Sequence, residues 1–138
     1  MTKEQLQQYI DIREERDDLA RRIKEIEDDL YGLRAQRLDG MPRGGSGESY
    51  VQEERMDDKT ELLALYEAKK AELDAALLAI ERAIEKLGPR ERRLVRLHYI
   101  DGLTWERVAV AMDYSWRQVH RIHDAALKKL NEEETTTP

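Results

Sequence analysis

The sequence contains no cysteine and no phenylalanine, and aromatic residues make up only 6% of its 138 positions. Without cysteine the chain has no disulfide framework, no thiol chemistry and no cysteine metal site. Scarce aromatics and 39% charged residues leave little material for a thick core, and they are typical of long helices. No apolar run approaches membrane-spanning length, and the start MTKEQLQQYI lacks a secretory hydrophobic region. We therefore expect an all-α, soluble, cytoplasmic protein.

Signatures of catalysis are equally scarce. No serine lies in a G-x-S-x-G pattern, and the carboxylates are spread along helix surfaces instead of forming an isolated, apolar-flanked pair. The glycine-rich stretch 40–49, GMPRGGSGES, lacks the G-x-x-x-x-G-K-[ST] pattern that cradles phosphate. His120 and His123 could form a metal pair beside Asp124, but no third ligand accompanies them. We expect no enzymatic activity, no metal and no cofactor.

The net charge of −6 by itself argues against a nucleic-acid partner, but its distribution changes that conclusion. Residues 1–88 hold 15 basic and 22 acidic side chains (−7), residues 89–131 hold 9 and 5 (+4), and the tail 132–138 adds −3. The basic charge is therefore concentrated in one C-terminal segment. Because this asymmetry is modest, it predicts salt-sensitive binding of moderate affinity to an anionic partner.

Two long helices are predicted within residues 1–88. Thr2 and Gln5 have the spacing of a capping box at the start of the first. Apolar positions then recur at steps of three and four, as in a coiled-coil seam, although an ordinary amphipathic helix gives nearly the same pattern. The first helix has the series Tyr9, Arg16, Ile23, Leu30 and Ile12, Leu19, Ile26, Leu33; the second has Met56, Leu63, Lys70, Leu77, Ile84 and Tyr66, Leu73, Ile80, Leu87.

The stretch 40–49 separates these helices, and its four glycines and one proline exclude it from a helix interior. We expect a flexible loop there, a second helix from about Glu53, and an antiparallel hairpin of the two helices. Arg16 and Lys70 would lie close together in that hairpin, either paired with acidic neighbours or exposed at the edge (Glu15, Glu67, Asp74). Since a charged seam residue can fix the oligomeric state, we expect these helices to form a homodimer or to dock a partner.

Residues 89–131 are predicted to form three shorter helices. Gly88 and Pro89 suit the end of the hairpin and the first turn of the next helix. Asp101-Gly102 stops that helix near Ile100, because glycine adopts the left-handed conformation that closes a helix. Thr104 is a good N-cap for a second helix to about Met112. After residue 131 the acidic end, 132–138, is expected to be disordered.

A turn at Asp113-Tyr114 leads into the third helix, where Ser115 and Gln118 have the spacing of another capping box. Two short helices joined by such a turn are the sequence pattern of a helix-turn-helix. The apolar stripe of the third helix comprises Val119, Ile122, Ala126 and Leu130, and its opposite face is expected to carry Trp116, Arg117, His120, Arg121, His123 and Asp124. Arginine and glutamine on a helix end suit a DNA major groove, although such charges can also be merely solvated.

The stretch RRLVRLHYIDGLTWERVAVAMDYSWRQVHRIHDAALKKL resembles region 4 of bacterial sigma factors, which reads the promoter's upstream element. It is still more similar to the phage regulators related to ArpU and RinA, whose patterns Y-I-x-G-L-[ST]-W and Y-S-x-x-x-V-x-R-x-x-x-x-A-L match Tyr99 to Leu127. It departs from them at Asp113, where glycine is usual; aspartate tolerates a positive φ better than most residues. The resemblance implies that the groove-facing residues are Trp116, Arg117, His120 and Arg121.

Together these observations predict a phage-type, sequence-specific transcriptional regulator in a bacterial host cell, with double-stranded DNA as its partner. The expected DNA contacts are Thr104, Ser115, Trp116, Arg117, Gln118, His120 and Arg121, with Arg92, Arg93, Arg107 and Lys128 as candidate phosphate contacts. Two alternatives remain open. One is a sigma-like protein that docks on bacterial RNA polymerase, and the other is a phage assembly protein such as a small terminase subunit.

Overall fold

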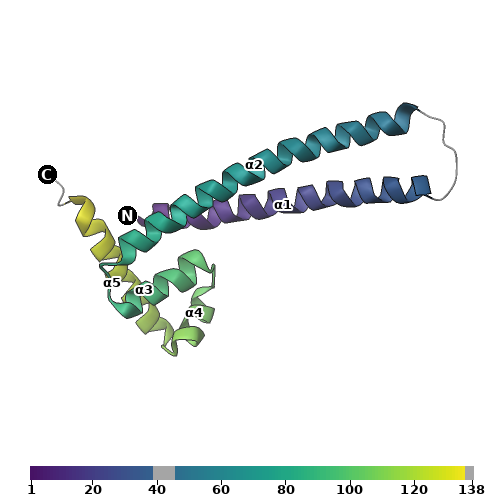
Figure 1. Ribbon diagram of the computed structural model, residues 1–138. Coiled ribbons are helices and arrows are strands. Elements are labelled where there is room, and N and C mark those ends of the chain that lie inside the picture. Colours follow the sequence, from purple (N-terminus) through teal and green to yellow (C-terminus); the bar gives the residue numbers. More distant parts are fainter. Residues whose placement is uncertain (39–45, 136–138) are drawn as a thin grey trace. The chain divides into compact units, whose positions relative to one another are not determined.

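The computed structural model describes residues 1–38 and 46–135, and every regular element within them is helical. Two long helices come first, α1 (Lys3–Leu38) and α2 (Ser46–Ile84). Four shorter elements follow: α3 (Pro89–Val95), the π-helical turn η1 (Arg96–Ile100), α4 (Trp105–Met112) and α5 (Trp116–Thr135). The predicted all-α class, a long helical hairpin followed by a helix-turn-helix, is confirmed (Figure 1). None of the described helices is long and apolar enough to cross a membrane.

The chain divides into two compact units, and the division differs from the boundary at residue 88 that the sequence suggested. Unit 1 comprises Met1–Arg13 with Glu72–Pro138, and unit 2 comprises Glu14–Ala71. The ends of both long helices therefore belong to the helix-turn-helix unit. The physical reason is a shared apolar core, because the short helices alone cannot cover the apolar side chains of η1 and α5.

Two apolar clusters hold unit 1 together. The first joins the start of α1 and the end of α2 to the C-terminal helices: Leu6, Tyr9, Leu73, Ile80, Ile84, Leu87, Val95, Tyr99, Ala126 and Leu130. The second lies inside the helix-turn-helix: Leu94, Val108, Met112 and Val119, with Leu97, Leu103, Trp105, Ala109, Tyr114 and Ile122 packed around them. The apolar stripe predicted for the third short helix is thus confirmed.

A polar contact adds to the packing between α1 and the C-terminal elements. The Arg13 guanidinium Nη1 donates a hydrogen bond of 2.6 Å to the carbonyl of Ile100, at the end of η1. The adjacent Gly102 adopts the predicted left-handed conformation, with φ of +75°. Arg13 therefore satisfies a carbonyl that the helix end leaves without an intrahelical partner.

In unit 2, α1 and α2 lie side by side and run antiparallel (Figure 1). Three ion pairs join the helices in antiparallel order, because the residue numbers rise along α2 as they fall along α1. They are Arg55 with Asp29 at 3.6 Å, Lys59 with Glu27 at 3.2 Å, and Lys69 with Glu15 at 2.6 Å. Arg16 instead binds its own neighbour, Asp17, at 3.0 Å. Each pair is partly exposed and so contributes little to stability, but together the pairs match a positive edge of α2 to a negative edge of α1.

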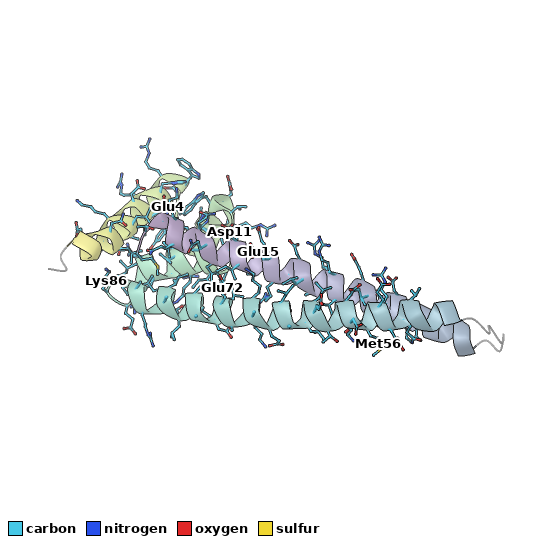
Figure 2. All side chains as sticks on the ribbon, turned by 90° about the horizontal axis from the view of Figure 1, so that it is seen from above. Glu4, Asp11, Glu15, Met56, Glu72 and Lys86 are labelled. Atoms are coloured by element: carbon cyan, nitrogen blue, oxygen red, sulfur yellow. The ribbon has the colours of Figure 1, made fainter. Side chains whose placement is uncertain are left out.

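The apolar seam predicted on α2 is correct near Ile84 and wrong further up the helix. Ile84 is fully buried, whereas Leu63 is 40% and Met56 is 56% exposed; Figure 2 labels Met56 on α2. An α-helix with 3.6 residues per turn drifts about 20° per heptad from a strict seven-residue repeat. Over the four heptads from Ile84 to Met56, this drift approaches the angle of one residue. The contact position shifts accordingly by one residue, from Leu63 to Leu62, which is half-buried. Tyr66, a member of the other predicted series, is half-buried as well.

Two further boundaries differ from expectation. The second helix begins at Ser46, not at about Glu53, so residues 46–49 of the predicted loop are helical. A helix that has already formed extends by one hydrogen bond per residue without a new nucleus. By the same reasoning α5 continues to Thr135, through part of the tail expected to be disordered. The rest of that loop, 40–45, and the end of the tail, 136–138, lie outside the described residues.

Candidate nucleic-acid interface

The helix-turn-helix is built from α4, a tight turn and α5 (Figure 1). Thr104 caps α4 as predicted, since its Oγ1 accepts a hydrogen bond of 3.3 Å from the Arg107 backbone N–H. Asp113 ends α4 with φ of 58° and ψ of 44°, the left-handed conformation expected there. The backbone N–H of Tyr114 then donates to the carbonyl of Ala109 at 3.0 Å. The turn therefore closes without glycine and reverses the chain into α5.

The first turn of α5 is closed by the predicted capping box. The Ser115 backbone N–H donates to Gln118 Oε1 at 3.0 Å, and the Gln118 backbone N–H donates to Ser115 Oγ at 3.2 Å. The two side chains satisfy two backbone donors that a helix start leaves free. The Gln118 amide oxygen is thereby occupied, and its NH₂ group is the part that remains for a ligand.

We expect Ser115→Ala to lower the free energy of unfolding of unit 1 by about 1 kcal/mol, because it removes the acceptor for the Gln118 N–H. Tryptophan fluorescence during urea unfolding measures this, since Trp105 and Trp116 both belong to unit 1. Ser115→Asp, which keeps an acceptor oxygen, is the matched control and should retain most of the stability. Equal unfolding midpoints for the alanine variant and the unaltered chain would contradict the role of the cap.

The side chains expected to meet DNA are mostly exposed along one side of α5. Trp116 is 59% exposed, and Arg117 and Arg121 are exposed on the first two turns. Thr104, Ser115 and Gln118 are exposed as well, at the starts of α4 and α5. The N-terminal residues of a recognition helix are those that reach base edges. The structure therefore brings two guanidinium groups and an indole together at the start of α5.

The candidate phosphate contacts differ from one another. Arg107 and Lys128 are exposed, whereas Arg92 is half-buried, and its Nε has no hydrogen-bond partner within the described part of the chain. The Arg93 guanidinium Nη2 donates to the carbonyl of Ala111 at 3.2 Å, so it ties α3 to the end of α4. The guanidinium of Arg90, on the same helix as Arg92 and Arg93, lies 5.6 Å from the centre of the Tyr114 ring.

His123 was expected on the exposed face of α5, and this was wrong. It is only 5% exposed, and its Nε2 lies 2.6 Å from the Tyr99 hydroxyl. The spacing contains the signal that was overlooked: residue 123 is four positions after Val119 and three before Ala126, so it lies on the buried stripe. Burial lowers the pKa of His123 to about 4 and raises the pKa of Tyr99 to about 12, because it disfavours the charged form of each.

His98, on η1, packs against the rings of Tyr99 and His123. Its Nδ1 lies 2.8 Å from the Leu103 carbonyl, and its ring stacks on Trp105 with centroids 3.7 Å apart. Burial lowers the pKa of His98, and the hydrogen bond to Leu103 offsets part of that shift. All three histidines and both tryptophans of the chain thus lie where η1, α4 and α5 meet. The described residues contain no group of three or more side chains suited to hold a metal ion.

This arrangement is that of a DNA-binding helix-turn-helix. Its recognition helix, α5, is capped, has an exposed face that bears arginines, and is supported by α3, η1 and α4. Residues 83–132 match the family described as Sigma-70, region 4, so this part of the chain is a sigma region 4-like module. Region 4 domains bind DNA and RNA polymerase. No curated protein and no solved structure matches the chain.

Proposed function

We propose that this protein is a sequence-specific transcriptional regulator that inserts α5 into the major groove of double-stranded DNA. The observation that carries the proposal is the geometry at the start of α5. The capping box fixes the first turn, and the exposed side chains beside it are two arginines and a tryptophan. Arginine pairs with the O6 and N7 acceptors of guanine, so Arg117 and Arg121 are proposed to read or clamp bases.

The remaining residues have supporting roles in this proposal. Gln118 assists through its amide NH₂ group, and Trp116 packs against a sugar or a thymine methyl group. Thr104 and Arg107 at the start of α4 lie where a helix-turn-helix approaches the DNA backbone, with Arg92, Arg93 and Lys128 as further phosphate contacts. Residues 89–131 carry a net charge of +4 within a chain of −6, which supports salt-dependent attraction of this part of the chain to phosphate.

Unit 2 is proposed to provide a homodimer or partner contact. Val51, Met56, Leu63 and Leu65 of α2 are between 40% and 56% exposed. Association through this part of α2 would remove apolar surface from water, which is favourable. A phage regulator related to ArpU and RinA would combine such a hairpin with a region 4-like module. A small terminase subunit, which assembles as a ring, is the alternative within phage proteins.

A second candidate function is docking on bacterial RNA polymerase, and the match of residues 83–132 to sigma region 4 favours it. In that case the region 4-like surface would engage the polymerase, and the protein alone would bind DNA weakly. Selection of bound duplexes from a random library, with the purified protein at near-physiological salt, separates the two. Enrichment of an inverted repeat supports a dimeric regulator, and its half-site spacing gives the distance between recognition helices. Failure to enrich any sequence, with co-purification of polymerase, supports docking.

We expect Arg121→Ala to weaken binding to the selected duplex by about 1–3 kcal/mol, since it removes one base-reading guanidinium. Fluorescence anisotropy with the selected and a scrambled duplex measures the effect. The control is Arg82→Ala, which removes the same charge from an exposed position on α2 and should change affinity little. An Arg121→Ala variant with intact helicity and unaltered affinity would refute the assignment.

A further inference from the structure

Four aromatic rings form a row from the core of unit 1 to its surface. His98 of η1 stacks on Trp105 of α4, with centroids 3.7 Å apart and planes at 16°. Trp105 in turn contacts His120 of α5, with centroids 4.9 Å apart. His120 contacts Trp116, one helical turn earlier, with centroids 3.9 Å apart. The outermost ring, Trp116, is 59% exposed. Three elements thus support one indole at the start of α5.

The position of His120 in this row decides what its ring can do. Its Nε2, the ring nitrogen farther from the backbone, is buried and has no hydrogen-bond partner in the described part of the chain. A histidine that reads a base must expose that nitrogen at the surface, so that it can hydrogen-bond to a base edge. Here the ring is instead enclosed between the indoles of Trp105 and Trp116. His120 therefore contributes its ring faces, although the sequence suggested it as a DNA contact.

Trp116 presents the opposite case, a large and mostly apolar surface directed outward. It is the first residue of α5, and residues at this end of a recognition helix reach base edges. The major groove offers one apolar group to such a side chain, the C5-methyl of thymine. An indole has only two side-chain torsions, and the His120 ring behind it restricts them further. A rigid apolar surface in a fixed place can distinguish a base that carries a methyl group from one that lacks it.

We infer that Trp116 is a specificity-determining residue that reads a thymine methyl group, and that His120 is a positioning residue that holds the indole through the ring row anchored on Trp105. This inference rests on the proposed function, because it requires α5 to enter the major groove. Of the two contacts proposed for Trp116, a sugar or a thymine methyl group, it selects the methyl group. It also means that His120 does not hydrogen-bond to a base.

Uracil substitution tests the methyl contact directly, since uracil pairs as thymine does but lacks the C5-methyl. Each thymine of the selected duplex is replaced in turn, and affinities are measured by anisotropy. The expected result is a loss of about four-fold at one or two positions, the value of burying one methyl-sized group. Trp116→Ala should bind the thymine and uracil forms equally there. Val110→Ala, which truncates an 82% exposed apolar side chain of α4, should keep the discrimination.

Two variants of His120 separate positioning from base reading. His120→Phe keeps a ring but has no nitrogen, and we expect it to retain both affinity and discrimination between thymine and uracil. His120→Ala should lose the discrimination because the indole is no longer supported. If His120→Phe loses as much affinity as His120→Ala, the ring nitrogen contacts the DNA and the positioning role is overturned. The phenylalanine variant keeps this test decisive even where the alanine variant folds poorly.

The outcomes also separate this inference from the proposed function. If the unaltered protein enriches no specific duplex, the proposed function fails and the inference fails with it. If it enriches a specific duplex that is insensitive to uracil, or whose sensitivity persists in Trp116→Ala, the inference alone is overturned. A selected half-site that contains no thymine would also overturn the inference alone.

Discussion

Leu6→Ala should destabilise the helix-turn-helix unit by about 2–5 kcal/mol, although Leu6 is more than eighty residues away from that motif in sequence. Leu6 is fully buried in the cluster that contains Tyr99 and Leu130. Truncation to alanine removes three carbon atoms from this cluster and leaves a cavity among side chains held by five different elements. The loss falls on unit 1, because Met1–Arg13 belongs to it.

Urea unfolding followed by tryptophan fluorescence measures this effect, since Trp105 and Trp116 lie in the same unit. Gln8→Ala is the matched control: it lies on the same helix, is exposed, and changes helix propensity little. We expect the control to retain the unfolding midpoint. Leu6→Ala should lower this midpoint, and at urea concentrations near the midpoint it should also lower the affinity for DNA. An unchanged tryptophan transition in Leu6→Ala would mean that residues 89–131 fold independently of the first helix.

The local signals of the C-terminal segment could be predicted from sequence because each depends on neighbours three or four residues away. Thr104, Ser115 with Gln118, and the left-handed Asp113 all occur where expected. Their hydrogen bonds close within one helical turn, so distant packing does not alter them. The same holds for the Thr2–Gln5 box at the start of α1, with contacts of 2.8 and 3.3 Å.

Long-range packing could not be predicted in the same way. The seam predicted on α2 includes Met56, whereas the structure exposes it. This error comes from treating a 3.6-residue helix as a 3.5-residue repeat over four heptads. The burial of Leu6 depends instead on the cluster that it shares with Tyr99 and Leu130, which no local pattern indicates. The division into compact units also differs from the expected boundary at residue 88, because no local pattern indicates that the start of α1 shares a core with η1 and α5.

The candidate site shows the same limit. Its exposed arginines follow from helical periodicity, because Arg117 and Arg121 are four residues apart and opposite the apolar stripe. The ring row does not follow from it: His98, Trp105 and His120 come from three elements, and only the tertiary fold brings them together. Histidine was read as a polar surface residue, so its role as a packed aromatic ring was missed at both His120 and His123.

Acidification should therefore destabilise unit 1 well before most carboxylates titrate. His123 has a pKa of about 4 in the folded chain against an ordinary 6.5, because burial disfavours its charged form. The groups around it offer little compensation: Asp124 Oδ1 is 3.9 Å away, while His98, His120 and Lys3 oppose a further positive charge. Tyr99, hydrogen-bonded to Nε2, is neutral, since its own pKa is raised to about 12.

The sign follows from which state binds more protons. Between pH 7 and pH 4 the unfolded chain protonates residue 123 and the folded chain does not, so stability falls as pH falls. The contribution of His123 is fully present above its unfolded pKa of 6.5 and is lost progressively down to about 4. The loss amounts to roughly 3 kcal/mol in all, of which about 2 kcal/mol falls between pH 7 and pH 5. His98 adds to it in the same direction, because its pKa is lowered too.

Urea unfolding at a series of pH values from 7 to 5 measures this slope while most carboxylates remain ionised. Glu81, whose pKa is lowered by its hydrogen bonds to Arg96, contributes only at lower pH, where its own protonation begins. The matched variant is His123→Gln, which can still hydrogen-bond to Tyr99 but cannot take up a proton. We expect it to be less stable at pH 7 and to show a flatter profile, with about 2 kcal/mol less change across the window. A profile as steep as that of the unaltered chain would locate the acid sensitivity elsewhere, and the buried imidazole would then carry no net penalty for protonation.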